Sequence, residues 1–109
     1  MPQLYIQTYT RGVRFSWDVR KSTRNLRERG FDFEFAVQIF ENSTLERVDS
    51  RRDYGERRMI ALGRTQDIAL TVVYTDRAEA SGEIDRRIIS ARKSNRRERE
   101  AHNKATNAK

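Results

Sequence analysis

The side chains best suited to chemistry in this sequence are arginines, and they gather around its predicted strands. A guanidinium group stays charged when it is partly desolvated, and it forms paired hydrogen bonds to phosphate oxygens. Binding a phosphate group, and stabilising the charge that develops when such a group reacts, is therefore the chemistry that these residues predict. Seven arginines lie on or beside the predicted strands: Arg52, Arg57, Arg58, Arg64, Arg86, Arg87 and Arg92.

Each of these arginines also has an ordinary structural explanation. Ion pairs with Glu46, Asp49 or Glu56 would account for any single one of them. As a group, the arginines outnumber these three carboxylates, so several remain for binding an anion.

Other common catalytic groups are missing from the sequence. It has no cysteine, and its one histidine, His102, falls in a polar C-terminal segment. It contains neither a glycine-rich phosphate loop nor a nucleophile elbow. We therefore expect no serine-type triad, no metal and no cofactor. Because no N-terminal apolar run has the length of a signal peptide or a membrane span, we also expect a cytoplasmic protein without membrane contact.

The positive charge is concentrated at one end of the chain. Residues 86–109 hold nine Lys or Arg and two Glu, which equals the whole net charge of +7. A neutral body with a basic end is typical of a polyanion binder, since counterion release supplies most non-specific affinity for nucleic acid. A solvated, solubilising tail explains the same charge equally well.

The length of 109 residues suits one domain, spanning 1–109, with a core at 13–93 and a basic helix at 94–109. Such a helix either frays into solvent or lies against a partner, because alanines alone would hold it weakly. The only apolar residues that line up along it are Ala101, Ala105 and Ala108.

Two helices are predicted to follow a first strand. The alternating apolar residues at 13–17 predict the strand, with a weaker one before it at 4–8. Asp18 and Gly30 are natural caps for a helix over 19–29, whose exposed face carries Arg20, Lys21, Arg24 and Arg27. Asp32 caps the second helix, whose apolar stripe consists of Phe33, Val37 and Phe40 with Ala36 beside it.

Three or four further strands are predicted after Asn42, over 44–49, 58–63, 68–75 and 86–91. The strand over 68–75 is apolar on both faces, which predicts a central strand covered on both sides. One face consists of Ile68, Leu70, Val72 and Tyr74, and the other of Ala69, Thr71, Val73 and Thr75.

Four segments between residues 13 and 100 together resemble one family. They are FSWDVRKSTRNLRERGFDFEFAVQIF, ERRMIALGRT, VVYTDR and RRIISARKSNRRERE. Their order is similar to that of the BrnT toxins, the ribonuclease components of bacterial type II toxin–antitoxin pairs. Family members often carry a histidine where this chain has Arg52, so the resemblance leaves the general acid and base unidentified.

The resemblance implies an α+β, RelE-like fold, in which a small antiparallel β-sheet carries two N-terminal helices on one face and a third helix at the C-terminus. It implies endoribonuclease activity that inhibits translation. The implied partner is a cognate BrnA-like antitoxin with a ribbon-helix-helix module, and operator DNA would be bound only through that antitoxin.

The family match also suggests roles for individual residues. We expect RNA to be cleaved by its own 2′-hydroxyl, without a metal, to give a 2′,3′-cyclic phosphate and a free 5′-hydroxyl. Glu56 or Lys93 is the nearest candidate for proton transfer. The expected catalytic residues are Arg64, Arg92, Arg58 and Glu56; the RNA-binding residues are Lys93, Arg87, Arg52 and Arg96; the antitoxin-binding residues are Arg96, Arg97 and Arg99.

Two other classes of function fit the same sequence. One is a non-catalytic nucleic-acid-binding module whose basic tail tracks a phosphate backbone, although Tyr54 and Tyr74 are the few aromatics that its sheet would offer for base stacking. The other is a degenerate toxin that retains only antitoxin binding and autoregulation.

Overall fold

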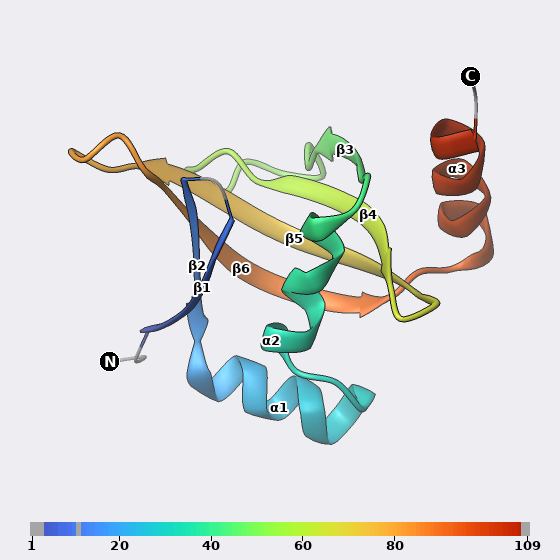
Figure 1. The fold of residues 1–109 in the computed structure, drawn as a ribbon, viewed down its shortest axis with the longest axis horizontal. Helices are drawn as coiled ribbons and strands as arrows, with labels where there is room; N and C mark the ends of the chain where they lie inside the picture. Colours follow the sequence, from blue (N-terminus) through green and yellow to red (C-terminus); the bar gives the residue numbers. More distant parts are fainter. Residues whose placement is uncertain (1–3, 11, 108–109) are drawn as a thin grey trace.

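The computed structural model describes residues 4–10 and 12–107, which form a six-stranded sheet in the order β1-β2-β6-β5-β4-β3 (Figure 1). The strands are β1 (Leu4–Thr10), β2 (Val13–Asp18), β3 (Leu45–Val48), β4 (Met59–Thr65), β5 (Ile68–Ala78) and β6 (Ile84–Lys93). The helices are α1 (Val19–Arg29), α2 (Phe33–Ala36), the 3₁₀ helix η1 (Val37–Glu41) and α3 (Arg96–Asn107). All of the predicted strands are present, and the α+β class is confirmed.

The expectation of a wholly antiparallel sheet is wrong for one pair of strands. β2 and β6 run parallel, with Val13 opposite Ile84 and Trp17 opposite Ile88. The other neighbouring strands are antiparallel. The parallel pair arises because the chain leaves β2 through α1 and returns beside it only after the other strands have been laid down.

Helix α1 begins and ends where the sequence predicts. Asp18 accepts hydrogen bonds from the backbone N–H groups of Arg20 (2.9 Å) and Lys21 (3.4 Å), and Gly30 ends the helix with a φ of 89°. The helix runs on from the end of β2 along the second half of β6, where Arg29 Nη1 donates to the carbonyl of Ala91 at 2.8 Å. On this side of β6, β2 therefore lies beside the first half of the strand and α1 beside the second half.

The second helix is shorter than predicted and tightens after one turn. Asp32 accepts a hydrogen bond from the N–H of Phe35 as expected, but the chain continues beyond Ala36 as a 3₁₀ helix. Three residues per turn place Ala36 and Ile39 on the same side, and both are fully buried. Ile39 then packs so closely on Gly63 that a Cβ there would lie 2.9 Å from the Cβ of Ile39.

The main core lies between the sheet and the segment that contains α2 and η1, and β5 runs through its centre. Leu70, Val72 and Tyr74 of β5 point into this core, while Val73 packs on the other face with Ile60 and Leu62. Thr71 and Thr75 are also buried on that second face, so the prediction of a central strand covered on both sides is confirmed. Ile68, at the start of β5, is an exception because it is 36% exposed.

Candidate functional site

The face of the sheet opposite α2 and η1 carries basic residues brought together by strand register. Side chains alternate along a strand, so residues paired across neighbouring strands share a face. Thr75 of β5 pairs with Arg87 of β6, which pairs with Ser16 of β2. On the other side, Thr75 Oγ1 donates to the carbonyl of Arg57, immediately before Arg58. Arg58 and Arg87 therefore flank Thr75.

Lys21 completes this group from the first turn of α1. It is half-buried and lines a cavity of about 180 Å³ with Ile89 and Ser90 of β6. Burial lowers the pKa of the Lys21 ammonium group, and the positive charges of Arg87 and Arg58 lower it further, while the nearby carboxylate of Asp18 partly opposes the shift. We call Lys21, Arg58 and Arg87 the cation cluster.

Two members of the cation cluster form no close ion pair with a carboxylate among the described residues. Neither Lys21 nor Arg87 forms a salt bridge there, and the buried Nε of Arg87 has no hydrogen-bond partner in the same part of the chain. Lys21 and Arg87 are neighbouring positive charges that repel each other unless an anion lies between them, whereas Arg58 is paired with Glu56. The arrangement therefore favours the binding of an anionic group.

Arg58 is held in place by two neighbours from the loop before β4. Its Nε donates to Glu56 Oε2 at 3.1 Å, and its guanidinium group lies 4.1 Å from the centre of the Tyr54 ring. Arg52 approaches the same ring at 5.4 Å. The predicted residues Arg58, Glu56, Arg52 and Arg87 thus lie in one region of the molecule.

Arg64 and Arg92, which were predicted to be catalytic, lie toward the other end of the sheet. Arg64 stands six residues beyond Arg58, which corresponds to roughly 20 Å along a strand. Its Nη1 donates to the carbonyl of Asp67 at 3.3 Å in the turn between β4 and β5. Arg92 forms an ion pair with Glu98 of α3, with both nitrogen–oxygen distances 2.8 Å. The structure does not bring either residue to the cation cluster.

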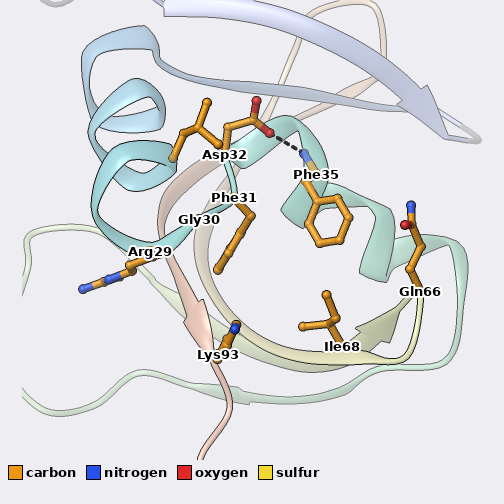
Figure 2. A pocket seen from close by; sticks show the side chains of 9 residues that line it. Arg29, Gly30, Phe31, Asp32, Phe35, Gln66, Ile68 and Lys93 are labelled. Carbon is orange, nitrogen blue, oxygen red and sulfur yellow. Dashed lines mark hydrogen bonds between the residues drawn. The ribbon is translucent and has the colours of Figure 1, made fainter.

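Two further basic residues of β6 lie on the helix-bearing side of the sheet. Lys93 lines a pocket there with Phe31 and Phe35 (Figure 2). Arg86 lies over the rings of Phe40 and Tyr74, at 4.9 and 4.2 Å from their centres, and pairs with Asp76. Because Lys93 lies on the opposite face, it does not approach the cation cluster.

The alanines of helix α3 do not hold it on the body, in line with the expectation that they would hold it weakly: Ala101 and Ala105 are exposed, and Ala108 lies outside the described residues. The helix docks through polar groups instead. His102 is buried, and its Nε2 lies 2.9 Å from the carbonyl oxygen of Ser43. The expectation that this histidine lies out in a polar tail is therefore wrong. The basic residues predicted to bind the antitoxin are exposed: Arg96, Arg97 and Arg99.

Lys21 is the member of the cation cluster that the sequence analysis did not include among its site residues. The sequence placed it on an exposed helical face with Arg20 and Arg24. A weak signal was present, because a lysine in the first turn of a helix opposes the helix dipole. Its neighbours Arg58 and Arg87, however, come from the loop just before β4 and from β6, far along the chain, so local sequence could not reveal that they lie near Lys21.

Several features bear on cofactors and on membrane contact. No group of three or more histidine, cysteine or acidic side chains suited to a metal ion occurs in the part of the chain that the structure describes. Across residues 4–10 and 12–107, no helix has the length and apolar character needed to span a membrane.

The chain matches the model of a known protein family. The model of the family described as "Ribonuclease toxin, BrnT, of type II toxin-antitoxin system" matches residues 17–98. This range includes the last two residues of β2, all members of the cation cluster and the ion pair between Arg92 and Glu98. No curated protein matches the chain.

Proposed function

Because the chain belongs to the BrnT family of ribonuclease toxins of type II toxin–antitoxin systems, we propose that it is a metal-independent endoribonuclease whose reaction centre is the cation cluster. The observation that carries this proposal is the grouping of Lys21, Arg58 and Arg87, in which neither Lys21 nor Arg87 forms a salt bridge within the described chain. A phosphodiester of RNA is an anion that such a group would bind.

The reaction needs no group beyond the substrate and these side chains. The 2′-oxygen of the ribose forms a bond to the adjacent phosphorus, and the bond from phosphorus to the 5′-oxygen breaks. The products are a 2′,3′-cyclic phosphate and a free 5′-hydroxyl. Arg58 and Arg87 would bind the non-bridging phosphate oxygens, where negative charge increases in the transition state.

Two groups beside the phosphate are suited to move the protons. Glu56, next to Arg58, would accept the proton of the 2′-hydroxyl. Lys21 would donate a proton to the leaving 5′-oxygen, because burial and neighbouring charges lower the pKa of its ammonium group and make it a better acid. Lys93, the other candidate from the sequence, lies on the opposite side of the sheet.

The remaining predicted contacts extend over the same face. Arg64, Arg92 and Arg52 would contact RNA on either side of the scissile phosphate, since they lie beyond the cation cluster along the sheet. Cleavage of cytoplasmic RNA would inhibit translation. The proposal also includes a RelE-like fold, which the resemblance to this family implies.

The proposed partner is a BrnA-like antitoxin with a ribbon-helix-helix module, through which alone the complex would bind operator DNA. The exposed arginines of α3 would attract acidic side chains of this antitoxin. They are Arg96, Arg97 and Arg99.

Expression from an inducible promoter, with and without the neighbouring gene, tests the proposal. Growth arrest that the neighbouring gene relieves is the expected result. If the protein is a non-catalytic nucleic-acid-binding module, any growth arrest that it causes should persist after an active-site substitution. A degenerate toxin would give no arrest and would still co-purify with the product of the neighbouring gene.

A further inference from the structure

An open pocket on the helix-bearing side of the sheet is lined by apolar side chains that are exposed to solvent. It has a volume of about 380 Å³ and lies between the end of α1, the start of α2 and the start of β5 (Figure 2). Leu26 (49% exposed) and Ile68 (36%) line it. Val48 is the third large hydrophobic residue that is exposed in the described chain, and it lies elsewhere, on β3. Clustered exposed apolar residues of this kind mark an interaction surface.

The rim of this pocket is basic. Arg29 and Lys93 contribute positive charges from α1 and β6. The one acidic residue of the lining, Asp32, is already used as a helix cap, because its Oδ1 accepts a hydrogen bond of 2.9 Å from the N–H of Phe35. An occupant with an apolar anchor and acidic side chains beside it therefore matches both the floor and the rim.

We propose that this pocket binds an acidic segment of the antitoxin, with one large apolar side chain inserted between Leu26 and Ile68. The inference rests on the proposed function, because a toxin of this kind has an antitoxin as its partner. It adds a second surface that the antitoxin would contact, separate from α3. The segment would place carboxylates against Lys93 and Arg29. Buried apolar anchors of this kind supply most of the binding free energy at interfaces.

Two other occupants fit less well. A second copy of this chain, docked face to face, would bring Arg29 and Lys93 against the same positive charges. RNA would require open aromatic faces for stacking. Phe31 is only 7% exposed, and Phe35, which is partly exposed, packs its ring against that of Phe31 with 6.0 Å between the ring centres.

The position of the pocket connects it with α3. Lys93 stands three residues before Arg96, so the pocket lies near the start of α3, although α3 packs on the opposite face of the sheet and a bound segment would pass around the end of β6 to reach its arginines. The cation cluster lies on the other face of the sheet. Substitutions in the pocket should therefore weaken antitoxin binding without slowing RNA cleavage.

The test measures the affinity of the full chain for the purified small protein encoded beside its gene, by titration calorimetry. Leu26→Lys and Ile68→Lys should each raise the dissociation constant about thirtyfold or more, as expected for loss of an interface anchor. Lys93→Glu should raise it about tenfold through charge reversal. Val48→Lys, the matched control at the third exposed hydrophobic residue, should leave it within about threefold.

The same variants are then assayed for RNA cleavage, with circular dichroism as the check on folding. Since Leu26 and Ile68 are solvent-exposed, lysine fits at both positions. Folded Leu26→Lys and Ile68→Lys proteins that bind like Val48→Lys would overturn the proposal, as would slower RNA cleavage with unchanged antitoxin affinity. If the unaltered chain cleaves no RNA, the proposed function fails, while the affinities still decide whether the pocket binds the antitoxin.

Discussion

Arg92 of β6 and Glu98 of α3 form a two-pronged ion pair, with 2.8 Å for each nitrogen–oxygen distance. The carboxylate also accepts hydrogen bonds from Thr71 Oγ1 at 3.1 Å and from the N–H of Asn95 at 2.8 Å. Glu98 thus accepts four hydrogen bonds: two from Arg92 of β6, one from Thr71 of β5 and one from Asn95 just before α3. This contact fixes the start of α3 against the sheet.

The free energy of unfolding should depend on pH because of this contact. The hydrogen bonds from Arg92 lower the pKa of the Glu98 carboxyl from its ordinary value of 4.5 to about 2. The unfolded chain therefore takes up the proton first as the pH falls. The stabilisation is complete above about pH 5 and is lost progressively as the pH approaches 2.

We expect Glu98→Gln to lower the free energy of unfolding by about 1 kcal/mol at neutral pH. Between about pH 5 and 2, the variant protein should lose less stability than the unaltered protein, because it lacks the carboxyl group that takes up a proton. Glu100→Gln is the matched control, because its ion pair with Arg96 is solvent-exposed. Urea unfolding at each pH measures both quantities. Parallel stability curves for Glu98→Gln and the unaltered protein would contradict the assignment.

The attachment of α3 should also depend on His102. Its buried ring lies 2.9 Å from the Ser43 carbonyl oxygen, and we expect His102→Ala to cost about 1–3 kcal/mol of stability. Amide hydrogen exchange should then become faster in α3 than in β5. Asn103→Ala, at the exposed neighbouring position, should change neither measurement.

The two groups of arginines should differ in their kinetic effects. Arg58→Ala should lower kcat about a hundredfold, since it removes a group placed at the reacting phosphate. Arg64→Ala should mainly raise KM, by about three- to tenfold, because Arg64 would contact RNA farther along the strand. Steady-state cleavage of a short RNA separates the two constants. Equal losses of kcat in both variants would mean that the reaction centre lies between them.

Sequence patterns predicted most elements of this fold, because each is determined locally. Asp18 and Gly30 cap α1 as expected, and the two apolar faces of β5 identified a central strand. The shift from α2 into η1 could not be predicted, since it follows from the close packing of Ile39 on Gly63, which lies 24 positions along the chain.

The candidate site was less predictable for a related reason. The sequence indicated basic residues on a sheet, but the strand register decides which of them meet. Arg87 and Arg92 share β6, yet one joins Lys21 and the other is neutralised by Glu98. Lys93, next in sequence to Arg92, points to the opposite face.

RNA cleavage should not need a divalent metal ion, because arginine and lysine side chains supply the positive charge at the phosphate. We expect an unchanged cleavage rate in excess EDTA. Loss of cleavage with the chelator, and its restoration by magnesium, would instead make acidic residues such as Glu56 metal ligands.

The most direct test of the cation cluster is cleavage of a single-stranded RNA by the purified Arg87→Ala protein, with analysis of the product ends. Arg27→Ala, an exposed arginine of α1, is the control. We predict 2′,3′-cyclic phosphate ends from the unaltered and Arg27→Ala proteins, and a rate about a hundredfold lower for Arg87→Ala with an unchanged melting temperature. A folded Arg87→Ala protein that cleaves at the unaltered rate would contradict the assignment.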